Sequence, residues 1–163
     1  MTVVRPATRD DVAQMHDMIL ALAIYEEGLH EVVATAADLE RVLFGDGAGV
    51  VRAHVIDNPD GPGLAGMAIW FLNYSTWEGK YGLWLEDLYV RDEHRGKGYG
   101  RALMEALAQV CVENDYTRFG WWVLDWNTPA IEVYTRLGAV PMDEWTVYRL
   151  TGDPLNQLGQ QEH

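Results

Sequence analysis

The spacing of apolar residues divides the chain into helical and extended stretches. Over residues 8–27 the apolar side chains recur at intervals of three and four, the period of one buried helix face: Val12, Met15, Ile19 and Leu22. Glu26 falls on the same line, and we expect it to face a cleft because an unpaired acid is costly in a sealed core. Gly28 is expected to end this helix. The capping sequence at Thr35 predicts a second, shorter helix.

Extended stretches follow. Residues 50–56 and 64–73 are strand-like and flank a turn rich in Asn, Pro and Gly, which predicts an antiparallel hairpin. Residues 81–90 predict a long third strand. Residues 118–124 are apolar and aromatic on both faces, which favours a central, fully buried strand. Residues 139–150 are expected to form a final hairpin.

Helical periodicity returns at residues 98–114 and 128–138. Together these elements predict one α/β domain over residues 1–150, in which roughly six or seven strands form a mixed (α+β), mostly antiparallel twisted sheet flanked by about four helices. Residues 151–163 are expected to be a poorly ordered C-terminal tail.

The long strand carries two adjacent acids. Strict alternation over residues 83–90 places Glu86 and Asp87 on opposite faces, each within an apolar row. A carboxylate in such a row either finds a partner or has its pKa raised, and a raised pKa makes it a good base near neutral pH. Glu86 is the favoured base because it can meet Glu26 across a cleft. Asp87 is either a second functional acid or a structural one.

A glycine-rich sequence joins this strand to the following helix: Arg95-Gly96-Lys97-Gly98-Tyr99-Gly100. A strand that ends in such a loop and leads into a helix presents several backbone N–H groups and a helix dipole to one point. The pattern therefore predicts an anion site, most naturally for a phosphate. An ordinary strand-to-helix turn with solvated charges is the alternative.

Two familiar phosphate loops do not fit. A P-loop requires a Lys-Ser or Lys-Thr pair, whereas this chain continues as Gly100-Arg101-Ala102. The dinucleotide-binding fingerprint requires a third glycine, and Leu103 stands in its place.

Charge limits the partners. The chain has 25 acidic and 12 basic residues and a formal net charge of -13, which repels nucleic acid and anionic membranes and steers cationic substrates inward. An acidic surface that serves solubility alone is the alternative.

The remaining composition predicts a soluble, cytoplasmic chain. No apolar run approaches the roughly 18 residues of a membrane span, and no secretory segment opens the sequence. The single cysteine, Cys111, excludes an internal disulfide and falls in an apolar helical stripe, so we expect a core residue. The five histidines are scattered, and no metal site is expected.

Four segments in order resemble the GNAT superfamily of N-acetyltransferases, and among them the diamine acetyltransferases that include the spermidine/spermine and thialysine enzymes. They are Leu85-Glu86-Asp87-Leu88-Tyr89-Val90, the glycine loop, Asp125-Trp126-Asn127 and Tyr134-Thr135-Arg136-Leu137-Gly138-Ala139. The resemblance extends over most of the chain.

The resemblance implies an acetyl-CoA site. Backbone groups of Leu88, Tyr89 and Val90 would contact the pantetheine arm, and the amide near Leu88 would stabilise the oxyanion. The pyrophosphate would be held by the whole loop, Arg95, Gly96, Lys97, Gly98, Tyr99, Gly100 and Arg101. Asn127 and Ala130 would contact the cofactor from another side. Tyr134 matches the general acid that protonates the departing thiolate; a core tyrosine is the alternative.

The resemblance also implies an amine site. Tyr25, Glu26 and Glu86 correspond to it, as do positions at or near Trp121 and Trp122. A primary amine arrives protonated, so it needs a base, and Glu86 is the candidate, directly or through water. Trp77 either holds an alkyl-ammonium chain by a cation–π contact or only anchors a loop.

One departure leaves the substrate open. Ser75 stands where polyamine-specific members often carry an acid, so small diamines and lysine-like amino acids remain candidates besides polyamines.

The sequence therefore predicts direct acetyl transfer to a primary amine, without a covalent acetyl-enzyme. A peptide or protein N-acetyltransferase and a non-catalytic acyl-CoA-binding module are the alternatives. A homodimer is expected, with residues 139–150 at its interface.

Overall fold

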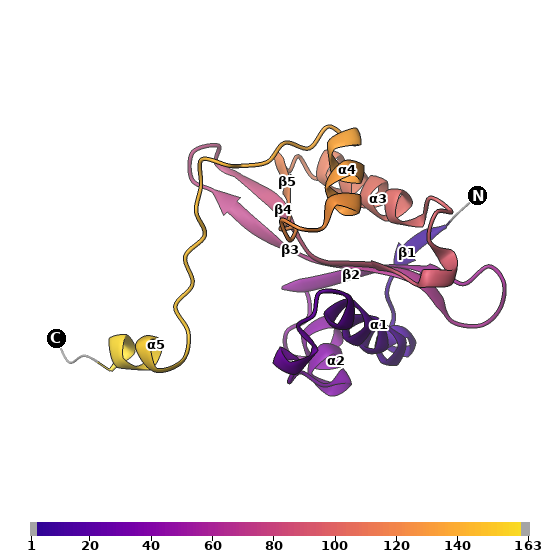
Figure 1. Cartoon of the computed structure of the whole chain (residues 1–163), viewed down its shortest axis with the longest axis horizontal. Helices are drawn as coiled ribbons and strands as arrows, with labels where there is room; N and C mark the ends of the chain where they lie inside the picture. The colour runs from indigo at the N-terminus through magenta and orange to yellow at the C-terminus, as the bar shows by residue number, and fades with distance from the viewer. Residues whose placement is uncertain (1–2, 161–163) are drawn as a thin grey trace. The chain divides into compact units, whose positions relative to one another are not determined.

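The computed structural model describes residues 3–160 and divides into two units, Met1–Leu124 and Asp125–His163. The first unit contains a five-stranded sheet in chain order (Figure 1): β1 Val4–Pro6, β2 Val51–Asp57, β3 Leu64–Ser75, β4 Lys80–Val90 and β5 Arg118–Gly120. Its helices are α1 Val12–Tyr25, α2 Ala36–Phe44 and α3 Tyr99–Glu113, with short 3-10 turns at Arg9–Asp11, Leu29–Glu31 and Asp92–His94. The second unit contains α4 Thr128–Arg136 and α5 Gly152–Gly159.

The sheet is mixed, as predicted. Strands β1 to β4 pair antiparallel with their neighbours, and β5 pairs parallel to β4 after the crossover through α3. The expected count of six or seven strands was wrong, because the described residues form five.

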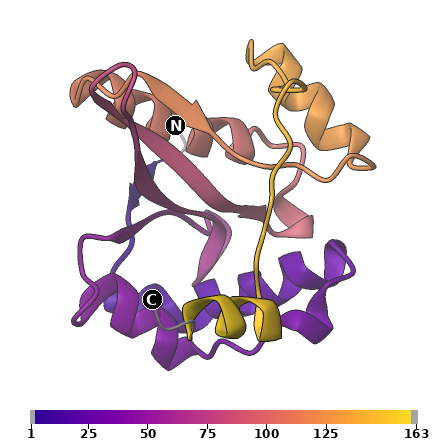
Figure 2. The ribbon, with the colours of Figure 1, turned by 90° about the vertical axis from the view of Figure 1, so that its left-hand side faces the viewer.

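Helices cover both faces of the sheet. Helices α1 and α2 lie on one face, and α3 lies on the other (Figures 1 and 2). The core beneath α1 and α2 includes Met15, Met18 and Met67, which are fully buried. On the α3 face, a Cβ at Gly66 of β3 would meet Leu103 of α3 at 3.4 Å, so helix and sheet are in close contact there. Cys111 is buried in α3, as expected.

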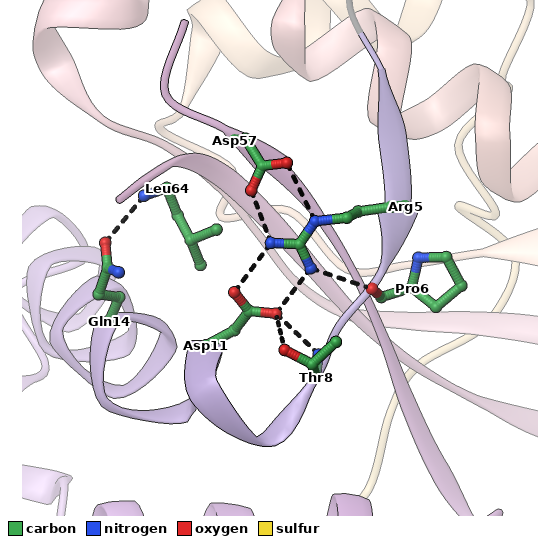
Figure 3. Close-up of polar contacts among 7 residues, drawn as sticks. All are labelled: Arg5, Pro6, Thr8, Asp11, Gln14, Asp57 and Leu64. Carbon is green, nitrogen blue, oxygen red and sulfur yellow. Dashed lines mark hydrogen bonds and ion pairs between the residues drawn. The ribbon is translucent and has the colours of Figure 1, made fainter. Parts of the chain in front are cut away.

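An ion-pair cluster fixes the start of α1 against the sheet (Figure 3). The Arg5 guanidinium in β1 donates to the carboxylates of Asp11 at 2.8 Å and Asp57 at 2.6 Å. Asp11 is buried, and its hydrogen bonds from Arg5 hold the pKa of its carboxyl below the usual value. One turn into α1, the Gln14 side chain accepts a hydrogen bond from the Leu64 N–H at 2.8 Å. These contacts fix the start of α1 against the sheet.

The end of α1 differs from the prediction by one residue. The helix ends at Tyr25, and Glu27, not Gly28, adopts the left-handed conformation, with φ of 62°. The Gly28 N–H donates to the Ala23 carbonyl at 2.8 Å, which closes the turn. A non-glycine residue in this conformation is strained by about 1 kcal/mol.

The C-terminal third of the chain departs most from the sequence analysis. Residues 118–124 were expected to form a central buried strand, but β5 ends at Gly120 and is the last strand of the sheet. Residues 139–150, all described, contain no strand, so the expected final hairpin was wrong. Residues 151–160, part of the expected tail, include the helix α5, while 161–163 lie outside the described residues.

Candidate active site

The glycine loop adopts the conformation that an anion site requires. Gly96 and Gly98 have φ of 75° and 84°, which other L-residues rarely adopt. A Cβ at either position would meet no atom within 4 Å, so the space beside the loop is open. Gly98 is the N-cap of α3 and has no side chain with which to cap it. The first N–H groups of α3 therefore face this space without an acceptor in their own helix.

Each basic residue of the loop already has an acidic partner. Nη2 of Arg95 lies 2.9 Å from Oδ1 of Asp92, and Nζ of Lys97 lies 3.5 Å from Oδ2 of Asp60. Nε of Arg101 lies 2.7 Å from Oε1 of Glu105. These pairs offset the positive charge around the loop. The backbone N–H groups and the helix dipole are therefore the main attraction for an anion.

The loop conformation leads to a testable expectation. Replacing Gly98 by alanine puts a Cβ on a left-handed residue, which costs about 1 kcal/mol or more and shifts the loop away from its anion-binding form. Coenzyme A affinity, measured by titration calorimetry, should fall about tenfold. Gly100→Ala is the matched variant, because Gly100 is helical and its Cβ would only touch Val90 at 3.9 Å. Equal losses in the two variants would contradict the proposed role of the loop conformation.

Strand β4 has an open edge beside the loop. Among residues 3–160, strand β5 pairs with β4 only from Gly82 to Trp84. Beyond that point the outward backbone groups of β4 are those of Leu88 and Val90, and among residues 3–160 no strand lies beside them on this side. The backbone of Tyr89 faces β3, and Nε of Arg95 donates to the Val90 carbonyl. An extended ligand can take up these hydrogen bonds as an added strand does.

A β-bulge at Glu86 changes the faces of β4. Ile69 pairs with Asp87 and Trp70 pairs with Leu85, which leaves Glu86 as the extra residue. Cross-strand partners share a face, so Asp87 lies on the α1 side of the sheet and Leu85 lies on the α3 side. The predicted alternation, with Leu85 and Asp87 on one face, was wrong because the bulge reverses the order.

The structure adds Asp87 as a candidate base. Burial, with repulsion first from Glu86 and then from Glu26, raises the pKa of Asp87 to about 6. Burial also raises the pKa of Glu26, which caps the end of α1. These interactions bring three carboxylates to one region, whereas the sequence argument joined only Glu26 and Glu86. In the sequence, the signal for a functional role of Asp87 was its position beside Glu86 within an apolar strand.

These carboxylates suit an organic cation. Among residues 3–160, no group of three His, Cys, Asp or Glu side chains is arranged to hold a metal ion. A protonated amine needs no such convergence, because it interacts with one or two carboxylates at a time. The Glu86 side chain is exposed and Asp87 is half-buried, so the group extends from solvent into the protein.

The three tryptophans expected at the amine site lie in the first unit. Trp77 is 90% exposed in the turn between β3 and β4, at the opposite end of β4 from the glycine loop. Trp122 packs edge-on against Trp84, and Trp121 packs against Phe119. The structure therefore does not bring Trp77 together with the three acids of its own chain. Ser75 is buried and accepts a hydrogen bond from the Glu78 N–H at 3.2 Å, which is a turn-forming role.

The remaining predicted residues lie on α4 in the second unit. Asn127 is the N-cap and is buried, and Pro129 occupies the first turn. Asn127, Ala130 and Tyr134 follow one another at intervals of three and four, so they share one face of this helix. Tyr134 is half-buried.

Comparison with known proteins shows the family. Residues 17–139 match the acetyltransferase (GNAT) family, and this match crosses from the first unit into the second. The chain is 32% identical to the thialysine N-epsilon-acetyltransferase of Caenorhabditis elegans, over 94% of each protein. It is 29% identical to L-ornithine N5-acetyltransferase NATA1 of Arabidopsis thaliana, over 95% of this chain and 86% of that one.

Solved structures share the fold. The integron cassette protein VCH_CASS6 of V. cholerae superimposes with a TM-score of 0.79 at 24% identity, over 98% of both chains. A possible acetyltransferase from Clostridium difficile 630 gives 0.77 at 21% identity, over 93% of this chain and 98% of that one. Separately, no helix within residues 3–160 is long and apolar enough to cross a bilayer.

Proposed function

Because the chain belongs to the GNAT family and is an N-acetyltransferase, we propose that it transfers acetyl from acetyl-CoA to a primary amine of a small cationic substrate. The candidate substrates are diamines, polyamines and lysine-like amino acids. The observation that carries this proposal is the group of Glu26, Glu86 and Asp87, with the raised pKa of Asp87, at the end of α1 and on β4, the strand that precedes the glycine loop. The net charge of -13 supports it, since it attracts cations.

The first unit fits acetyl-CoA. The open space beside Gly96 and Gly98, with the N–H groups at the start of α3, suits the diphosphate. The edge of β4 at the backbone groups of Leu88 and the N–H of Val90 suits the amide-containing arm, with Tyr89 between them facing β3. When bound, acetyl-CoA supplies an activated acetyl thioester. The backbone N–H near Leu88 would donate to its carbonyl oxygen as negative charge develops there.

The chain's own side chains handle the protons. A primary amine has a pKa of about 10.4 and must lose a proton before it attacks. Glu86 or Asp87, directly or through water, accepts that proton. The amine nitrogen then bonds to the acetyl carbon as the carbon–sulfur bond breaks, and Tyr134 donates its hydroxyl proton to the departing thiolate. The proton released by the new amide re-forms the Tyr134 hydroxyl through solvent. Cys111 has no part in this, so we expect it to be dispensable.

The relatives support a small amine. One acts, by its name, on L-ornithine and another on thialysine. The human spermidine/spermine N(1)-acetyltransferase-like protein 1 is 29% identical over 98% of this chain, which corresponds to 24% of that protein. We place the catalytic domain at residues 1–150. Exposed apolar side chains such as Val140 and Trp145 support a homodimer through residues 139–150.

An acceptor panel tests the substrate class. Ornithine, thialysine, lysine, putrescine, spermidine and an N-terminal peptide are each supplied with acetyl-CoA, and release of free thiol is followed. We expect kcat/KM for at least one small cationic amine to exceed that for the peptide by about a hundredfold, equivalent to about 3 kcal/mol. A preference for the peptide would replace this proposal with a peptide N-acetyltransferase. Coenzyme A binding without turnover of any acceptor would contradict the proposed reaction.

A further inference from the structure

The side chain of Arg95 is held between two tyrosine rings. Its Cζ lies 5.4 Å from the ring centroid of Tyr25 and 5.6 Å from that of Tyr89. Its Nη2 pairs with Asp92 at 2.9 Å, and its Nε donates to the Val90 carbonyl at 3.2 Å. The guanidinium is thus fixed by contacts from α1, from β4 and from the turn that follows β4. We call this arrangement of Arg95, Tyr25 and Tyr89 the arginine clamp.

The arginine clamp joins the two elements that carry the acids. Tyr25 is the last residue of α1 and directly precedes Glu26. Tyr89 follows Asp87 by two residues on β4 and shares its face of the sheet. A contact that fixes Tyr25 over Tyr89 therefore also fixes the distance between Glu26 and Asp87.

The end of α1 needs such a contact. Beyond Tyr25 the chain turns through Glu27 in the left-handed conformation, which a non-glycine residue adopts at a cost. The turn is closed by the hydrogen bond from the Gly28 N–H to the Ala23 carbonyl, which fixes it within α1 but not against the sheet. The clamp supplies an attachment of the helix end to β4.

We infer that Arg95 is a positioning residue for the amine site, because its clamped guanidinium holds the end of α1, and with it Glu26, against the Asp87 part of β4. This inference rests on the proposed function. It gives the first residue of the glycine loop a role on the acceptor side in addition to the one predicted for the diphosphate. A planar guanidinium stacks between two rings in a way that a lysine ammonium does not.

Steady-state kinetics of Arg95→Lys and Arg101→Gln test the inference. Arg95→Lys keeps the positive charge of the loop and loses the planar stacking. Its KM for the amine should rise about tenfold, while its KM for acetyl-CoA should stay within about twofold. Arg101→Gln removes a loop cation that pairs with Glu105 of α3, and the KM of this variant should rise for acetyl-CoA and not for the amine. Deuterium uptake over residues 20–28 should be faster in Arg95→Lys than in the unmodified chain.

The outcomes separate this inference from the proposed function. An unchanged amine KM in Arg95→Lys, in a chain that turns over small amines, overturns the positioning role and leaves the function standing. A rise in the acetyl-CoA KM alone also overturns it, because the residue would then serve only the diphosphate. Absence of turnover by the unmodified chain overturns the proposed function, and the inference with it. Thermal unfolding of each variant confirms that the kinetics refer to folded protein, and Arg95→Gln provides a second variant that removes the clamp.

Discussion

Replacing Asp87 by asparagine should slow acetyl transfer by about a hundredfold at pH 7.5, and at the same pH should stabilise the folded chain. The loss of rate is expected because an amide cannot accept a proton from the amine. The pH profile of kcat/KM in the unmodified chain should fall on its acidic side with an apparent pKa of about 6, the value to which burial and the neighbouring acids raise the pKa of Asp87.

The gain in stability follows from the same raised pKa. A carboxyl whose pKa is higher in the folded state stabilises the fold fully below its ordinary pKa of 3.8, and that contribution is lost as pH rises through about 6. Above this range the ionised Asp87 opposes folding by about 3 kcal/mol. Asparagine removes that cost, so the free energy of unfolding at pH 7.5 should rise by about 1–3 kcal/mol, with no gain at pH 4.

Urea unfolding at the two pH values and initial rates at pH 7.5 test this prediction. Glu93→Gln is the matched control, since Glu93 is an exposed acid on the turn after β4 and has no assigned role. Glu86→Gln shows how the base function is divided between the two acids. A destabilised Asp87→Asn variant at pH 7.5, or one with the rate of the unmodified chain, would rule out Asp87 as a buried catalytic base.

Replacing Tyr134 by phenylalanine should lower kcat about a hundredfold and leave coenzyme A affinity within about twofold. A phenol with a pKa of about 10 can protonate a thiolate whose conjugate acid has a pKa of about 8.5 at a modest cost, and phenylalanine cannot do so. The ring remains, so packing on α4 is preserved. The loss should therefore appear in turnover and not in binding.

Stopped assays of turnover and calorimetry of coenzyme A binding separate these two quantities. Tyr148→Phe is the matched control because Tyr148 is 93% exposed in the same unit and has no assigned role. A Tyr134→Phe enzyme with normal kcat would identify Tyr134 as a packing residue. A fall in coenzyme A affinity with unchanged kcat would assign it to binding instead.

The sequence predicted the features of the site that depend on local chemistry. The glycine loop was predictable because left-handed glycines before a helix leave a direct pattern, and Gly96 and Gly98 have that conformation. The end of α1 was predictable to within one residue. Glu27 takes the left-handed position because the turn must close at that point of the helix, although Gly28 is the residue with the intrinsic preference.

The bulge at Glu86 was not predictable from alternation. Alternation assumes that every residue of a strand has a partner, whereas pairing with β3 leaves Glu86 without one. This single inserted residue moves Leu85 and Leu83 to the face opposite Asp87 and Tyr89. Glu86 was favoured as the base because it was expected to meet Glu26 across a cleft, and the structure places Asp87 close enough to Glu26 for repulsion as well.

In the last third of the chain, apolar composition led to the prediction of more strand than the structure contains. The aromatic side chains of residues 118–124 pack against one another, as Phe119 and Trp121 do. Only three residues of this segment pair with β4. Residues 139–150 are rich in apolar side chains, yet large ones such as Val140 and Tyr148 are exposed. Apolar composition indicates that such side chains favour burial, but it does not identify the surface that covers them.

A crystal structure of the chain with coenzyme A and a small diamine tests the central claim most directly. The account predicts the diphosphate within hydrogen-bonding distance of the N–H groups between Gly96 and Arg101, and the diamine nitrogen beside Asp87, Glu86 or Glu26. A diphosphate bound away from the start of α3, or an amine bound away from these three carboxylates, would contradict it.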